Sequence, residues 1–156
     1  MRLLLVTGLS GAGKSTVLKT LEDLGYETID NMPLSLVPML LSAPEPSERM
    51  VAIGADARTQ DFSVPDFLRL IQETAAAGKH QLATLFLDST DDVLQRRYSE
   101  TRRKHPLAKG SPVLDGIQKE REIMEPLRDV AETVIDTTDM RPRDLQEIIK
   151  AKYATK

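Results

Sequence analysis

The chain has 156 residues, of which 40% are hydrophobic, and this size suits one domain with a sizeable core. Its 21 basic and 24 acidic residues leave a net charge of −3, which excludes the global positive field typical of a nonspecific nucleic-acid binder. The lack of cysteine excludes a disulfide framework, two histidines far apart argue against a zinc site, and no apolar stretch is long enough to span a bilayer. We therefore expect a soluble, cytoplasmic protein in which residues 1–156 form a single domain.

Short β-rich runs alternate with helical patterns along the chain, which is typical of parallel strands joined by crossover helices. We expect strands at about 2–7, 26–30, 50–56, 82–88 and 132–136. We expect helices at about 14–24, 33–42, 65–78, 90–104, 115–131 and 141–153.

The first strand leads into a loop that matches a phosphate-binding P-loop at every fixed position: Gly8-Leu9-Ser10-Gly11-Ala12-Gly13-Lys14-Ser15. Its glycines let the backbone turn its N–H groups toward phosphate oxygens, and the next helix faces the anion with its positive dipole end. We expect Lys14, as an exposed loop residue, to reach the β/γ-phosphates, and Ser15 to bind Mg²⁺, with Thr16 a weaker candidate behind it. An ordinary Gly-rich turn is the alternative. Strand, loop and helix together predict an α/β fold, a three-layer P-loop NTPase/kinase-like domain with a five-stranded, mainly parallel sheet.

The four later strands each end near an acidic residue, at the edge of the sheet where parallel sheets bind ligands: Asp30, Asp56, Asp88 and Asp136. We prefer Asp56 as the Walker-B carboxylate that holds Mg²⁺, because in small P-loop kinases the strand before it lies beside the P-loop strand. Asp88 is the competing candidate, with helix capping as its structural alternative.

Two further side chains, Arg58 and Asp30, have two interpretations each. Arg58, in Asp56-Ala57-Arg58-Thr59, would either hold a phosphate or form a surface pair with Asp56. Asp30 would either bind an acceptor substrate or, as we slightly favour, cap a helix whose first residue is Pro33.

The most basic segment lies after the fourth strand, where six basic residues and one acidic residue fall between Leu94 and Lys109. We expect Arg102 and Arg103 to close over the transferring phosphates as a lid and to act with Lys14 and Asp56 in catalysis. Contact with RNA phosphates is one alternative. A solvated helix face laced by Glu100 is the other.

No Asn-Lys-x-Asp stretch is present, so the base preference between ATP and GTP stays open. No glutamine or glutamate is obviously placed to orient an attacking water, which predicts slow hydrolysis.

Several blocks together resemble the RapZ/YvcJ family of nucleotide-binding proteins, also called RNase adapter proteins. They are the P-loop, Tyr26-Glu27-Thr28-Ile29-Asp30-Asn31-Met32-Pro33, Asp56-Ala57-Arg58, Phe86-Leu87-Asp88, the segment from Arg96-Arg97-Tyr98 to His105-Pro106-Leu107, and Val134-Ile135-Asp136-Thr137-Thr138. The resemblance implies binding and hydrolysis of ATP and GTP, with ATP on Gly8 to Ser15 and GTP on Asp56 to Thr59.

Chains of that family continue into a carboxyl-terminal domain implicated in RNA and amino-sugar-phosphate binding, so this chain looks like the amino-terminal domain alone. The resemblance therefore assigns RNA and ribonuclease partners to the longer protein. Two functions stay open: a regulatory domain with weak ATPase and GTPase activity, and a kinase that phosphorylates a small metabolite.

Overall fold

The computed structural model describes residues 1–42, 49–101 and 113–154, without the side chains of residues 99–101. Five strands form one sheet in the order β2-β3-β1-β4-β5, and all four neighbouring pairs are parallel. The strands are β1 (Arg2–Gly8), β2 (Glu27–Asp30), β3 (Met50–Gly54), β4 (Gln81–Asp88) and β5 (Thr133–Asp136). The predicted α/β class with a five-stranded parallel sheet is confirmed.

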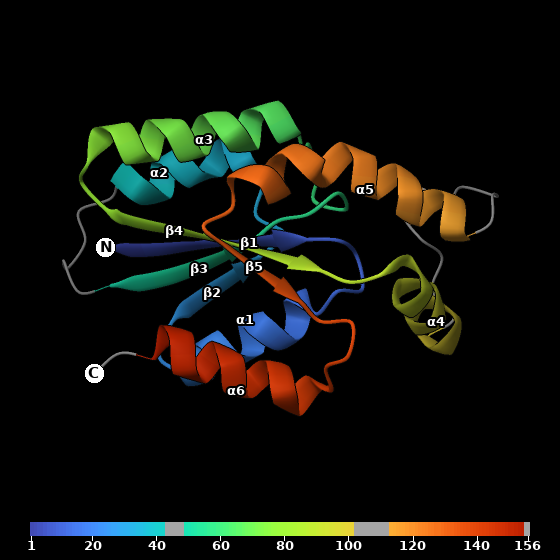
Figure 1. The fold of residues 1–156 in the computed structure, drawn as a ribbon. Helices are drawn as coiled ribbons and strands as arrows, with labels where there is room; N and C mark the ends of the chain where they lie inside the picture. Colours follow the sequence, from blue (N-terminus) through green and yellow to red (C-terminus); the bar gives the residue numbers. More distant parts are fainter. Residues whose placement is uncertain (43–48, 102–112, 155–156) are drawn as a thin grey trace.

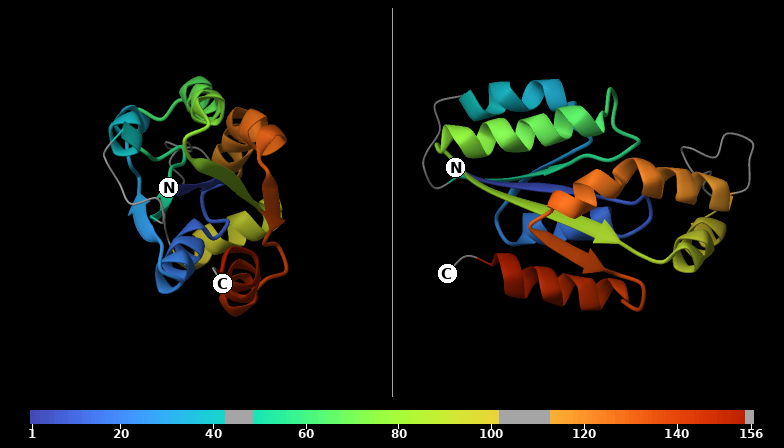
Figure 2. Two further views of the ribbon diagram at one scale, coloured as in Figure 1. Left: turned by 90° about the vertical axis from the view of Figure 1, so that its left-hand side faces the viewer. Right: turned by 45° about the horizontal axis from the view of Figure 1, so that its top comes forward.

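Helices cover both faces of the sheet and make the three predicted layers (Figures 1 and 2). One face carries α1 (Lys14–Asp23) and α6 (Pro142–Tyr153), which contact each other. The other carries η1 (Leu34–Leu36), α2 (Val37–Ser42), α3 (Val64–Ala77) and α5 (Val113–Val130), whereas α4 (Asp91–Thr101) packs on α5 beyond the end of β4. None of the described helices has both the length and the apolar character that a membrane crossing needs.

The expected helix at 33–42 is split into a short 3-10 turn and α2. Pro33 has an extended ψ of 133° and lies before the turn, so the expectation that it is the first helical residue was wrong. Pro38 lies within α2, at a position where its missing N–H breaks no hydrogen bond of the first turn.

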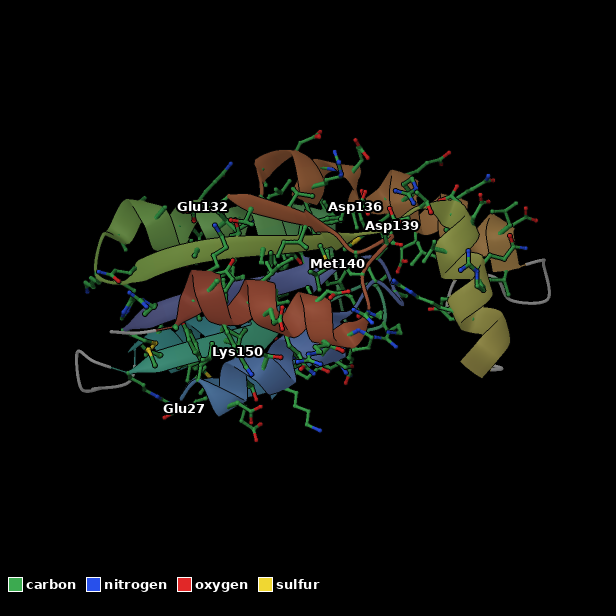
Figure 3. The ribbon with its side chains drawn as sticks, turned by 60° about the horizontal axis from the view of Figure 1, so that its bottom comes forward. Glu27, Glu132, Asp136, Asp139, Met140 and Lys150 are labelled. Atoms are coloured by element: carbon green, nitrogen blue, oxygen red, sulfur yellow. The ribbon has the colours of Figure 1, made fainter. Side chains whose placement is uncertain are left out.

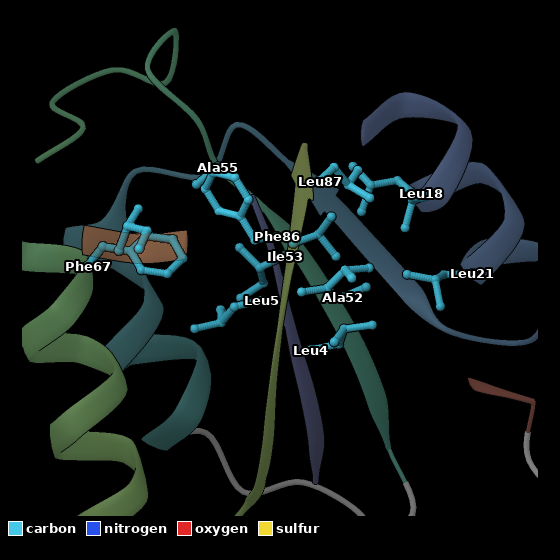
Figure 4. Packing of buried hydrophobic residues seen from close by; sticks show 14 of the residues in the cluster. Leu4, Leu5, Leu18, Leu21, Ala52, Ile53, Ala55, Phe67, Phe86 and Leu87 are labelled. Carbon is cyan, nitrogen blue, oxygen red and sulfur yellow. The ribbon is translucent and has the colours of Figure 1, made fainter. Parts of the chain in front are cut away.

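The core lies on both sides of the central strands (Figure 4). Leu3, Leu4 and Leu5 of β1 are 0–1% exposed, because β1 has a paired strand on each side and helices over both faces. Phe67 of α3 packs on one face and Leu21 of α1 on the other. Each fully buried side chain of this size stabilises the fold by about 1.5–3 kcal/mol, so the central strands that lead to the site are well anchored in the core.

The register brings the carboxyl ends of all five strands to one edge of the sheet, opposite the edge where β1 begins and α6 ends (Figure 1). Gly8 closes β1 at that edge with φ +150°, and a Cβ atom there would lie 2.4 Å from the carbonyl oxygen of Leu87. The close approach of β1 and β4 therefore requires glycine where the phosphate-binding loop begins.

Candidate functional site

The predicted P-loop joins β1 to α1 at the carboxyl edge of the sheet. Gly13 precedes the helix with φ 117°, a left-handed conformation that favours glycine. The first helical residue is Lys14, so the loop lies at the positive end of the α1 dipole. These features make the loop a suitable anion site.

Lys14 brings two strand ends together. Its Nζ lies 2.8 Å from Oδ1 of Asp30 and 2.9 Å from Oδ2 of Asp56, and it donates a longer hydrogen bond of 3.4 Å to Oδ1 of Asn31. The residue is 7% exposed, so the expectation of an exposed loop lysine was wrong. The ammonium is buried between the carboxylate of Asp30 at the end of β2 and that of Asp56, which follows β3.

Asp56 is the most buried member of this group, at 1% exposure. Its carboxylate accepts hydrogen bonds of 2.8 Å from the backbone N of Arg58 and 2.9 Å from Nη2 of the same residue. Burial alone would raise the pKa of Asp56, but the hydrogen bond from Arg58 and the charge of Lys14 outweigh it and hold that pKa below its ordinary value of 3.8. Asp56 is therefore ionised at neutral pH.

The residues after β3 are tied to those after β2. The hydroxyl of Thr59 accepts a hydrogen bond of 3.0 Å from the backbone N of Asp56 and donates one of 3.1 Å to Oδ1 of Asn31. Asn31 has a left-handed backbone, with φ 57°. Arg58 is paired with Asp56, but because Asp56 is buried the pair is not a simple surface pair, and Arg58 also lines the cavity beside the P-loop.

The other strand-end aspartates have different surroundings. Asp30 accepts its hydrogen bond from Lys14, and within the described residues none of its contacts caps the turn that follows. Asp88 is paired with Arg121 and Arg128 of α5, each at 2.9 Å, and also accepts from the backbone N of Ser89. Asp136 accepts a hydrogen bond from the backbone N of Thr138.

A cavity of about 260 Å³ opens beside the P-loop. Ser15 and Thr16, the two hydroxyl candidates, line it together with Leu9, Gly11, Gly13, Lys14, Asp56, Arg58, Arg97 and Tyr98. A second cavity of about 210 Å³ shares Gly11, Gly13, Thr16 and Arg97 and extends toward the loop between β5 and α6. Figure 3 labels Asp136, Asp139 and Met140 where the chain turns from β5 toward α6.

Arg102 and Arg103, the predicted lid arginines, lie outside the described residues, as does the side chain of Glu100. Of the remaining predicted residues, Asp56 contacts the Lys14 ammonium, Arg58 lines the cavity beside the P-loop, and Thr59 is hydrogen-bonded to the backbone of Asp56. The two segments expected from the family resemblance to bind ATP and GTP are therefore neighbours.

Sequence reasoning missed three residues that hold the P-loop: Arg97, Glu120 and Thr137. One signal was available for Glu120. The buried face of α5 carries Ile117, Glu120, Met124 and Leu127, so an acidic residue interrupts an otherwise apolar stripe. No comparable signal marked the other two: Arg97 is one of several arginines in a basic segment, and Thr137 is a polar residue after a strand, which is common.

Solved structures with a similar fold include a shikimate kinase from Acinetobacter baumannii in complex with shikimate, with a TM-score of 0.64 and 19% identity, over 97% of this chain and 92% of that one. A gluconokinase from Sinorhizobium meliloti 1021 matches with a TM-score of 0.61 and 20% identity, over 96% of this chain and 90% of that one. At such identities, the similarity shows the kinase-like P-loop fold alone.

Curated relatives are closer in sequence. A nucleotide-binding protein from Sphingopyxis alaskensis is 52% identical over 97% of this chain, and one from Dinoroseobacter shibae is 50% identical over 93% of it. The matches cover 49% and 48% of those proteins, so the chain spans about half the length of these relatives. The family described as the RapZ-like N-terminal domain matches residues 1–156, and the chain belongs to this family of nucleotide-binding domains.

Proposed function

We propose that this domain binds one nucleoside triphosphate with Mg²⁺ at the P-loop and hydrolyses it slowly. The observation that carries the proposal is the 2.9 Å contact between Lys14 and the buried Asp56, both of which line one cavity with Ser15. A phosphate group has the charge and the acceptor oxygens to draw the ammonium away from the carboxylates. Ionised Asp56 is then left beside the phosphates, where a divalent cation balances its charge.

The donor set fits Mg²⁺. Ser15 supplies a hydroxyl and Asp56 a carboxylate, and Mg²⁺ prefers oxygen ligands of these kinds together with phosphate oxygens and water. When bound, the cation would neutralise charge that develops on the phosphate oxygens. Lys14 and the P-loop amides would orient the phosphates.

We propose that ATP and GTP compete for this one site. Asp56 and Arg58 line the same cavity as the P-loop, and Thr59 is hydrogen-bonded to both Asp56 and Asn31, so the Asp56–Thr59 segment lies at the phosphate end. The second cavity, which continues from Gly11 and Gly13 to Met140 and Pro142, is of a size and position to take the nucleoside. The guanidinium of Arg97, which lines both cavities, offers a cationic plane to a base.

We still propose that Arg102 and Arg103 form a lid and stabilise the transferring phosphate. The elements on either side of them reach the site, because Arg97 of α4 and Glu120 of α5 both contact the P-loop. Among the residues described around the first cavity, none is a glutamine or glutamate that could orient water, which favours slow hydrolysis.

The second candidate is a small-metabolite kinase. Asp30 favours it, because its side chain is 42% exposed beside Lys14 and could accept a hydrogen bond from an acceptor hydroxyl. A regulatory or adapter role with RNA and a ribonuclease is a proposal for longer proteins of the family.

The test measures phosphate release from Mg·ATP and Mg·GTP, with and without pools of hydroxylated metabolites. Slow release that acceptors leave unchanged supports the hydrolytic domain. Acceptor-dependent loss of ATP with a phosphorylated product supports the kinase. Calorimetric titration that detects neither triphosphate contradicts both.

A further inference from the structure

The backbone of three consecutive P-loop residues, Ser10, Gly11 and Ala12, is held by side chains from three other parts of the fold. Glu120 of α5 accepts a hydrogen bond of 2.8 Å from the backbone N of Ser10. Arg97 of α4 donates one of 2.8 Å to the carbonyl oxygen of Gly11. Thr137, after β5, donates one of 2.7 Å to the carbonyl oxygen of Ala12.

Glu120 differs from the other two anchors in its chemistry, because it is a buried carboxylate. It is 0% exposed, and its second carboxylate oxygen accepts a hydrogen bond of 2.7 Å from the hydroxyl of Ser10. Both carboxylate oxygens therefore accept hydrogen bonds from Ser10, a loop residue that is 110 positions away in sequence. Burying a carboxylate is costly unless it is well hydrogen-bonded, and the neighbours Ile117 and Met124 show that this face of α5 suits apolar side chains.

We propose that Glu120 is a positioning residue that fixes the P-loop in its phosphate-binding conformation; this rests on the proposed function. A loop with glycines at positions 8, 11 and 13 has much conformational freedom, and a ligand that must order it loses affinity. The double hydrogen bond to Ser10 orders the loop before the nucleotide arrives. Glu120 lies outside the described cavity lining and acts through Ser10.

Three variants separate this role from a general contribution to stability. Glu120→Leu removes both acceptors and suits the apolar face of α5. Glu120→Gln keeps one acceptor for the Ser10 backbone, and its amide can donate to the Ser10 hydroxyl, since a hydroxyl also accepts. Thr84→Val is the matched control, because it removes a buried hydroxyl that accepts a 2.8 Å hydrogen bond from the backbone N of Glu132, away from the P-loop.

The first measurement is amide hydrogen exchange across residues 9–16 without nucleotide, and the second is the calorimetric Kd for Mg·ATP. We expect Glu120→Leu to speed exchange in the loop and to weaken binding by about tenfold or more, with Glu120→Gln restoring most of both. Thr84→Val should lower the midpoint of thermal unfolding without changing loop exchange or Kd.

Wild-type loop exchange in a folded Glu120→Leu protein would overturn the proposal, and so would a wild-type Kd. If that variant does not fold, Ser10→Ala removes the side-chain half of the contact, and unchanged exchange in residues 9–16 would overturn it equally. Exchange is measured without nucleotide, so it tests Glu120 even if wild-type protein binds no triphosphate, a result that would contradict the proposed function instead.

Discussion

Two buried aspartates flank the central strand β1, and they illustrate two uses of the same sequence pattern. Asp56 follows β3 and Asp88 lies at the end of β4, and they are 1% and 8% exposed. Asp56 contacts Lys14 beside the cavity at the P-loop, whereas Asp88 is paired with two arginines of α5 and lines a separate cavity of about 370 Å³. We propose that Asp56 belongs to a ligand site because a phosphate can engage its cationic partner Lys14, whereas the arginines paired with Asp88 tie it to α5.

Removing the cation on the Asp56 side should have the largest effect on binding. We expect Lys14→Met to weaken Mg·ATP affinity by about 100-fold, because it removes charge-assisted hydrogen bonds to phosphate. Arg128→Met is the matched control, since it removes one cation from Asp88. Calorimetric titration of both variants checks this, and equal losses of affinity would contradict the contrast between the two aspartates.

Replacing each aspartate by asparagine should mainly affect catalysis at Asp56 and mainly affect stability at Asp88. We expect Asp56→Asn to reduce Mg²⁺-dependent phosphate release by about tenfold or more, because a carboxylate is lost where the cation must be held. Asp88→Asn should instead lower the free energy of unfolding by about 1–3 kcal/mol, since it weakens two ion pairs of α5. Rates at several Mg²⁺ concentrations and urea unfolding measure the two effects. A stronger catalytic loss in Asp88→Asn would reverse the assignment.

The third prediction concerns Arg102 and Arg103, the arginines of the proposed lid. Replacing both Arg102 and Arg103 by Gln should slow hydrolysis several-fold and change the Kd for Mg·ATP less, as for contacts that strengthen in the transition state. If these arginines bind RNA instead, hydrolysis is unchanged and the salt dependence of RNA binding falls by roughly one per lost contact. Wild-type hydrolysis with wild-type RNA affinity would support the solvated-face alternative.

The smallest expected effect concerns pH. The pKa of Asp56 is lowered in the fold, so its contribution to stability is present above its unfolded pKa, near the ordinary 3.8, and is lost as pH falls through the lower folded value. Arg58→Gln should raise the folded pKa and reduce stability above about pH 4, but not well below it. Arg58 is 36% exposed, so we expect less than about 1 kcal/mol. Urea unfolding across pH checks this, and a pH-independent difference would contradict it.

The sequence predicted all five strands, because each is a short run rich in apolar or β-branched residues that ends at an acidic residue or a glycine. It also predicted that residues of the P-loop and of the segment after β3 belong to one region. It did not predict the burial of Lys14 or the Glu120 contact. These depend on side chains that meet across the fold, and local patterns contain little information about such long-range pairing.

We propose that the P-loop and the segment after β3 form a single triphosphate site. The most direct measurement is a calorimetric titration of Mg·GTP into protein that is saturated with a nonhydrolysable ATP analogue and Mg²⁺. Our account predicts competition, with GTP binding only as the analogue is displaced and with one nucleotide bound per chain. Binding of a second nucleotide, with an affinity for GTP that the analogue leaves unchanged, would contradict it.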